Sequence, residues 1–209
     1  MGGIMKILCL GDSITDCGRL LSSPPLGEGY VRDLDRLSAL DGYSWQFYNR
    51  GTDGFTITRL LNYVSNENLP LNVDLITLLI GINDMGLMMN TRRTPEQQEK
   101  MMETFFQQYE ILLKQLLAHV PKLILIEPFL FSKPAEYLNW FPLLNIMQKG
   151  IRMLSETYTL PYVPLQDFFM EASHTHGLSC ITTDGIHLTG YGHELLADRL
   201  YQRILMNFS

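Results

Sequence analysis

Short, uninterrupted apolar runs recur along this chain, and longer amphipathic segments separate them. Residues 6–10, 75–79 and 123–126 form three such runs, each with the length of a fully buried strand. Residues 45–49 and 162–163 are two further predicted strands. Strands that alternate with helices form parallel sheets through right-handed crossovers, with helices on both faces. The pattern therefore predicts an α/β fold built on one parallel sheet.

The clearest helix start lies at Thr94. This residue can cap the helix, Pro95 suits the first turn, and Gln97 completes a capping box. Pro121 is expected to stop the helix. The apolar face of this helix consists of Met101, Phe105, Leu112 and Leu116. Similar spacing predicts two further helices, one with Val31, Leu34 and Leu37 and a last one with Tyr191, Leu195, Leu196, Leu200 and Ile204.

Length and charge limit the kinds of protein that this chain can be. The 209 residues suit a single domain, 1–209, with a sizeable core. The net charge of −6 and the scattered basic residues argue against nucleic acid as a partner, because phosphate contacts need clustered Lys and Arg. No apolar stretch is long enough to cross a bilayer, so no membrane partner is expected. The sequence does not decide between a monomer and a homo-oligomer.

The cysteines and the amino terminus bear on the compartment. Cys9, Cys17 and Cys180 are odd in number, and their spacings match neither a disulfide framework nor a CxxC metal pair. This favours a reducing compartment. The amino terminus also lacks the basic region and long apolar run of a signal peptide, so we expect a cytoplasmic protein.

The first predicted strand runs into Gly-Asp-Ser-Ile-Thr-Asp at 11–16, where an α/β sheet places its ligand site. A serine at such a strand-to-helix turn can expose its hydroxyl and leave its backbone N–H free for an oxyanion. Ser13 can equally be an ordinary helix cap. The segment lacks both the GxSxG pattern of the α/β-hydrolases and the GK[ST] of a phosphate-binding loop.

The next two predicted strands also end in candidate donors. Residues 49–54 follow the second strand and include Gly51, whose backbone N–H no side chain blocks. Residues 81–84 follow the third and include Asn83, which offers a side-chain amide. Each alone is an ordinary turn residue. With Ser13, however, three strands each deliver one donor to the same sheet edge, which predicts an oxyanion-binding site there.

A base is predicted near the carboxyl end, in Asp-Gly-Ile-His at 184–187. Three residues of separation let the Asp184 carboxylate fold back onto the His187 imidazole and fix its tautomer. The imidazole can then take the proton of a serine hydroxyl. A histidine with its own orienting carboxylate, in a chain that also carries a candidate nucleophile, favours catalysis over a structural role.

Four segments of this chain resemble the SGNH (GDSL) hydrolases and occur in the order of that family. They are GDSIT at 11–15, a glycine in the second block, GxND at 81–84 and DxxH at 184–187. The resemblance implies that Ser13 is the nucleophile and that His187 and Asp184 complete a triad. It also implies that Gly51 and Asn83 join the Ser13 amide in the oxyanion hole. The implied fold is a flavodoxin-like three-layer α/β/α sandwich with about five parallel strands.

Within this family the chain most resembles microbial acetylxylan esterases and related carbohydrate acetylesterases. The likeness rests on GDSITDCGR at 11–19, Gly-Tyr-Val at 29–31 and Gly-His at 192–193. It implies hydrolysis of small-acyl esters, acetyl esters of carbohydrates in particular, through an acyl-enzyme. The second block departs from these relatives, which usually have Ser at the position of Asp53 and Asn at that of Phe55.

Two residues are candidate substrate contacts, Asp12 beside the nucleophile and Phe55 beyond the second block. Phe55 can close the end of an acyl pocket, or it can pack under the following helix. Glu171, His174 and His176 lie in a predicted polar loop without a clear fourth ligand, so we expect neither a metal nor an organic cofactor.

Two alternatives to a small-acyl esterase remain at the level of the sequence. A lysophospholipase or thioesterase would use an apolar channel for a long acyl chain. A non-catalytic binding module could use the same scaffold, because fold does not fix function.

Overall fold

The computed structural model describes residues 4–66, 69, 72–90, 92–120 and 122–208. Its single sheet has five parallel strands in the order β2-β1-β3-β4-β5. This is the flavodoxin-like order, in which the chain changes direction across the sheet between β1 and β3. The strands are β1 (Lys6–Gly11), β2 (Gln46–Gly51), β3 (Leu75–Leu79), β4 (Leu123–Ile126) and β5 (Tyr162–Val163). The predicted α/β/α sandwich is confirmed.

All five predicted strands form, and the bounds of two of them differ: β1 continues one residue further than predicted, to Gly11. The apolar runs that became β3 and β4 are buried at every position, as the central strands of a covered parallel sheet must be. The second strand begins one residue later than predicted and continues to Gly51, because its pairing with β1 extends until Gly51 lies opposite Gly11. Both strands therefore end together at the carboxyl edge of the sheet.

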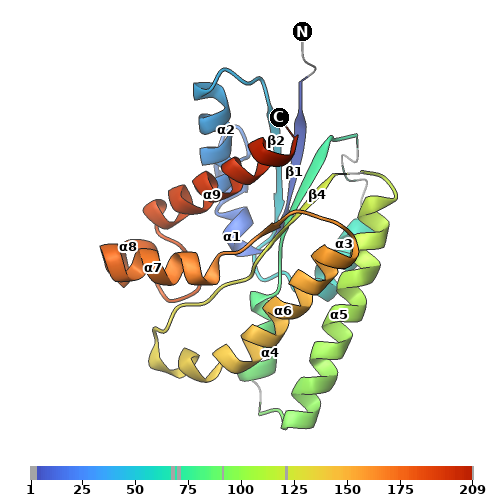
Figure 1. Cartoon of the computed structure of the whole chain (residues 1–209), viewed down its shortest axis with the longest axis vertical. Helices are drawn as coiled ribbons and strands as arrows, with labels where there is room; N and C mark the ends of the chain where they lie inside the picture. The colour runs from blue at the N-terminus through green and yellow to red at the C-terminus, as the bar shows by residue number, and fades with distance from the viewer. Residues whose placement is uncertain (1–3, 67–68, 70–71, 91, 121, 209) are drawn as a thin grey trace.

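Helices cover both faces of this sheet (Figure 1). On one face lie α2 (Tyr30–Leu40) and α9 (Gly190–Phe208), which pack on each other. On the other lie α3 (Ile57–Asn66), α5 (Pro95–Leu117) and α6 (Phe141–Thr157). The remaining helical elements are α1 (Ser13–Asp16), η1 (Arg19–Leu21), α4 (Ile82–Asn90), η2 (Ala135–Asn139), α7 (Gln166–His176) and α8 (Leu178–Ile181).

Helix α5 begins with the predicted capping box. The Gln97 N–H donates to Thr94 Oγ1 at 3.3 Å, and the Thr94 N–H donates to Gln97 Oε1 at 3.0 Å. Met101 was predicted to lie on the apolar face, but it is only half-buried, and its neighbour Met102 is buried instead. The helix ends at Leu117, and the predicted stop at Pro121 lies outside the described residues. The buried face consists of Met102, Phe105, Tyr109, Leu112, Leu113 and Leu116.

The predicted polar loop at 171–176 is wrong, because these residues belong to α7. The Glu127 carboxylate holds the start of this helix by accepting the N–H groups of Leu165 and Gln166, both at 2.7 Å. Throughout the described ranges, no three His, Cys, Asp or Glu side chains are grouped so that they could hold a metal ion. No described helix is long and apolar enough to cross a membrane.

Candidate active site

The carboxyl edge of β1 and β3 brings two predicted site residues together. Ser13 begins α1 directly after β1, and Asn83 lies in the first turn of α4 directly after β3. The two strands are hydrogen-bonded neighbours. This is the position between β1 and β3 at which a flavodoxin-like sheet opens a crevice for ligands.

Ser13, His187 and Asp184 form a continuous hydrogen-bonded chain. Ser13 Oγ lies 3.0 Å from His187 Nε2, and His187 Nδ1 lies 2.7 Å from Asp184 Oδ2. An ionised carboxylate can only accept a hydrogen bond, so Nδ1 carries the proton of the neutral ring. Nε2 is then left to accept the serine hydroxyl. The imidazole and the carboxylate are about half exposed, at 47% and 52%, so this arrangement opens to solvent.

The loop that carries Asp184 and His187 is held by its own backbone. The second carboxylate oxygen of Asp184 accepts the N–H groups of Ile186 at 2.9 Å and His187 at 2.8 Å. Burial raises the pKa of Asp184, but the hydrogen bonds from His187 and Ile186 outweigh this effect and bring the pKa below its ordinary value. Asp184 is therefore ionised and oriented toward the imidazole.

Asp12 supports the serine turn rather than facing a substrate, which corrects its predicted role. Its side chain is 1% exposed, and Oδ1 accepts the Ile14 N–H at 3.1 Å as the cap of α1. Oδ2 is buried and has no hydrogen-bond partner. Burial raises the pKa of Asp12 to about 7.

The side-chain amide of Asn83 is fixed beside the second loop. Asn83 Nδ2 donates one hydrogen to the backbone oxygen of Phe55 at 2.9 Å. An amide carries two N–H groups, so the second is available to another acceptor. Because this bond ties α4 to the loop after β2, residues 54–55 lie next to Asn83.

The Gly51 N–H differs from its predicted role as an oxyanion donor. It donates to Asn49 Oδ1 at 2.9 Å inside the buried end of β2, so it is already occupied. The same asparagine donates through Nδ2 to the backbone oxygens of Thr15 at 2.6 Å and Leu26 at 2.8 Å. Asn side chains commonly bond the backbone two residues on, and Asn49 precedes Gly51 by two residues. That spacing could have identified this bond from the sequence.

Gly54, further along the same loop, was given no role from the sequence. Within the described part of the chain its N–H has no hydrogen-bond partner. Its φ of +68° is a conformation that favours glycine. Its neighbour Phe55 is the residue whose carbonyl oxygen accepts from Asn83.

Phe55 takes the second of its two predicted positions. Its half-buried ring meets Tyr63 of α3 edge-on, with 5.8 Å between the ring centroids. It therefore packs under the helix that follows it. Its backbone oxygen, rather than its ring, is the group that contacts Asn83.

Asp84 also received no role from the sequence, although it belongs to the GxND block. Its buried carboxylate accepts the Ile57 N–H, with Oδ1 at 3.2 Å and Oδ2 at 3.0 Å, and so holds the start of α3. Burial raises the pKa of Asp84 to about 7. Asp84 thus holds the end of the loop after β2, at Ile57, while Asn49 holds its beginning, at Gly51.

His193 is a buried neutral histidine behind the serine turn, not a second base. Burial lowers its pKa to about 4. Its Nδ1 accepts the Tyr30 N–H at 3.2 Å, so Nε2 carries the hydrogen and faces Cys17 Sγ at 3.5 Å. Cys17, like Cys9 and Cys180, is a free cysteine.

A flavodoxin-like sheet with Ser, His and Asp in one hydrogen-bonded chain at its carboxyl edge has the architecture of a hydrolase. The model of the GDSL-like Lipase/Acylhydrolase family matches residues 9–195, so the chain belongs to that family. It is a carboxylic ester hydrolase. The resemblance inferred from the sequence is confirmed.

Individual relatives agree with this assignment. An acetylxylan esterase from Geobacillus stearothermophilus is 26% identical over 218 residues, which cover 98% of this chain and 95% of that protein. The structure of a GDSL-like lipase from Parabacteroides merdae has a TM-score of 0.84 at 28% identity and covers 97% of this chain and 96% of that one. A structure of a G. stearothermophilus acetylxylan esterase has a TM-score of 0.81 at 23% identity, covers 100% of this chain and 96% of that one, and shares the fold.

Proposed function

We propose that this protein removes acetyl and other small acyl groups from carbohydrate esters through an acyl-enzyme on Ser13. The observation that carries the proposal is the chain of hydrogen bonds from Ser13 through His187 to Asp184, at 3.0 and 2.7 Å. This arrangement meets the geometric requirement for a serine nucleophile with an oriented base.

In the first half-reaction, His187 Nε2 takes the proton of the Ser13 hydroxyl while Oγ attacks the acyl carbonyl carbon. The carbonyl oxygen becomes an oxyanion in the tetrahedral intermediate. The protonated imidazole is stabilised by ionised Asp184 and then gives its proton to the leaving alkoxide. The alcohol departs, and the acyl group remains bonded to Ser13.

In the second half-reaction, water replaces the alcohol. Neutral His187 takes a proton from the water molecule, whose oxygen attacks the acyl carbon. The new tetrahedral intermediate collapses, Ser13 leaves with the proton held by His187, and the carboxylic acid is released. His187 thus accepts or donates the proton at every step of the two half-reactions.

We assign the oxyanion to three donors: the backbone N–H of Ser13, the second N–H of the Asn83 amide, and the backbone N–H of Gly54. Ser13 is the first residue of α1, where a helix has no internal acceptor for its N–H. Gly54 replaces Gly51, whose N–H is already bonded to Asn49. Preorganised donors of this kind stabilise the charge that develops in the transition state.

The substrate class is supported by the relatives and by exposure of the site. One of the proteins similar to this chain, from Geobacillus stearothermophilus, is described as an acetylxylan esterase. Solved catalytic variants of a G. stearothermophilus acetylxylan esterase change a serine, an aspartate and a histidine, the residue types of the triad proposed here. The half-exposed His187 and Asp184 leave room for a bulky alcohol on their side of the site.

The test is acetate release from acetylated xylooligosaccharides, beside hydrolysis of p-nitrophenyl acetate and p-nitrophenyl octanoate. We expect acetate release and a strong preference for the acetyl over the octanoyl ester. A preference for octanoate would instead support the long-chain acylhydrolase. Absence of hydrolysis with all three esters, in folded protein, would contradict the proposed function and support a binding module.

A further inference from the structure

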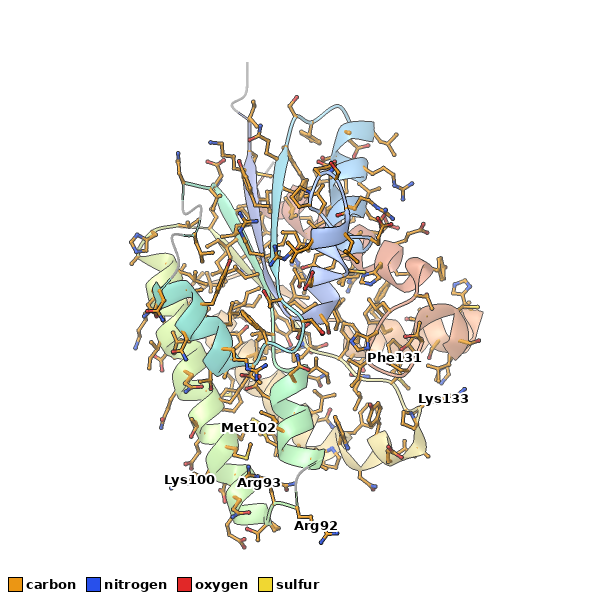
Figure 2. All side chains as sticks on the ribbon, turned by 180° about the vertical axis from the view of Figure 1, so that it is seen from behind. Arg92, Arg93, Lys100, Met102, Phe131 and Lys133 are labelled. Carbon is orange, nitrogen blue, oxygen red and sulfur yellow. The ribbon has the colours of Figure 1, made fainter. Side chains whose placement is uncertain are left out.

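A cavity of about 270 Å³ lies directly beside the triad carboxylate. Two segments that are far apart in the sequence form its walls: residues 133–134, between β4 and η2, and residues within 178–185, from α8 to Gly185. Figure 2 labels Lys133, which lies two residues beyond buried Phe131 on the first of these segments. Polar Lys133, Ser179 and Thr183 and apolar Pro134 and Leu178 line it together with Asp184.

The two walls are joined tightly at Gly185. The Phe131 N–H donates to the Gly185 oxygen at 2.9 Å. A Cβ at Gly185 would lie only 1.8 Å from the Lys133 oxygen, and the φ of Gly185 is +96°, so only glycine permits this approach. On the other side of the loop, Thr182 Oγ1 accepts the Gly185 N–H at 2.9 Å and donates to the His187 oxygen at 2.7 Å. The cavity is therefore built into the loop that orients the base.

The chemistry of the lining fits a sugar ring. Ser179 presents an exposed hydroxyl, which can both donate and accept hydrogen bonds, and exposed Thr183, whose hydroxyl donates to the His187 oxygen at 3.4 Å, keeps its lone pairs as acceptors. Lys133 is exposed and adds an ammonium donor that, among the described residues, takes part in no ion pair. Pro134 and Leu178 form an apolar wall, which suits the C–H face of a pyranose. At about 270 Å³ the cavity lies just below the ~300–1,000 Å³ of sites for drug-sized ligands.

Its position relates the cavity to the alcohol rather than to the acyl group. Asp184 both lines the cavity and bonds His187, and His187 is the group that protonates the leaving alkoxide in the proposed mechanism. The oxyanion donors Asn83 and Gly54 lie on the loops after β3 and β2 and do not line the cavity. A saccharide whose ester oxygen meets His187 can therefore extend over Asp184 into the cavity.

From this juxtaposition we infer that the cavity is a subsite for a second sugar residue, next to the residue that carries the acetyl group. This inference rests on the proposed function. It predicts that the enzyme gains affinity from an oligosaccharide alcohol that a small aryl ester cannot provide.

The experiment compares two substrates, acetylated xylooligosaccharide and p-nitrophenyl acetate, in Lys133→Gln, Ser179→Ala and the double variant. Both side chains are exposed, so the fold should be retained, which thermal melting checks. We expect KM for the oligosaccharide to rise about three- to tenfold in the double variant, the range for losing one or two hydrogen bonds. In the same variant, the fold-change in KM for the aryl ester should be at most a third of the fold-change for the oligosaccharide. Lys149→Gln, an exposed lysine of α6 that does not line this cavity, is the matched control and should change neither value.

The other possible outcomes distinguish failure of the subsite from failure of the proposed function. Equal changes for both substrates, or none in the double variant, would overturn the subsite while leaving the esterase intact. Hydrolysis of the aryl ester alone by the unaltered enzyme would remove both the subsite and the carbohydrate assignment. Hydrolysis of neither ester would remove the proposed function itself.

Discussion

At the scale of single residues, two carboxylates near Ser13 have opposite environments and opposite pKa shifts. Burial dominates at Asp12, whose Oδ2 has no partner, and raises its pKa to about 7. At Asp184 the hydrogen bonds from His187 and Ile186 outweigh burial and lower the pKa. Such a split separates a carboxylate that must stay ionised from one that is structural. Asp184 is the one that can stabilise an imidazolium.

The proposed oxyanion-donor role of Asn83 gives a quantitative prediction. Removing one side-chain donor from an oxyanion hole costs on the order of 10²–10³ in kcat. Asn83→Ala should fall in that range for acetate release, with KM nearly unchanged, because the donor acts in the transition state. The substitution also removes the bond to the Phe55 oxygen, so thermal melting of Asn83→Ala checks that the fold is retained. An effect confined to KM would mean that Asn83 only holds substrate.

At the scale of elements, the site depends on loops that are tied to one another across the ends of β1, β2 and β3. Asn49 is the main tie, since it is 1% exposed and joins the Gly51 N–H to the backbone oxygens of Thr15 and Leu26. The serine turn and the loop carrying Gly54 are thus held by one side chain. Their relative position is set before any substrate binds.

Loss of this tie should lower both stability and activity. Asn49→Ala leaves buried backbone groups without partners, at about 1–3 kcal/mol for each unsatisfied group. We expect a reduced free energy of unfolding in urea and a fall in kcat larger than any change in KM. Asn49→Asp keeps the acceptor for Gly51 but loses both donors, so it should also be destabilised. If Asn49→Ala matched the unaltered protein in stability and kcat, the loops would be held by other contacts.

Local signals in the sequence were enough for part of this architecture. The uninterrupted apolar runs of β3 and β4 and the capping box of α5 are contiguous patterns, and each element forms where it was predicted. Helix α7 could not be predicted in this way, because its start is held by Glu127, 39 positions before Gln166. Taken alone, the polar residues at 171–176 favour a loop, which is why the sequence did not predict this part of α7.

The same division applies to the candidate site. The DxxH spacing is local, and the structure brings Asp184 and His187 within 2.7 Å. Burial of Asp12 depends on how loops from different strands pack together, whereas occupation of the Gly51 N–H follows from Asn49, two residues earlier in the same strand. The residues around Asp12 alone do not show that its carboxylate is buried.

At the scale of the whole molecule, buried acids make stability depend on pH. Asp84 has a pKa of about 7 in the folded protein, above its ordinary value of 3.8. The folded state therefore binds the proton more tightly than the unfolded chain. This stabilisation is fully present below pH ~3.8 and is lost as the pH rises through about 7.

Asp84→Asn should remove this dependence, because asparagine keeps an oxygen acceptor for the Ile57 N–H and does not titrate. Relative to the unaltered protein, the variant should gain stability between pH 5 and pH 8, by about 1.4 kcal/mol per unit of pKa difference at most. Urea unfolding at several pH values measures this gain. For Glu171→Gln, which changes an exposed acid on α7, the difference in unfolding free energy from the unaltered protein should be nearly independent of pH. If the difference in unfolding free energy between Asp84→Asn and the unaltered protein did not change with pH, burial would not raise the pKa of Asp84 as described.

The central claim is that Ser13 is a nucleophile activated by His187, and covalent labelling tests it most directly. An organophosphonate ester should add its phosphonyl group once to the intact protein, and peptide mass spectrometry should place the adduct on Ser13. Ser13→Ala should stay unlabelled, and His187→Ala should label far more slowly, while both retain the melting behaviour of the unaltered protein. Labelling of Ser13→Ala at the full rate, or no labelling of the unaltered enzyme under conditions where it hydrolyses esters, would contradict the account.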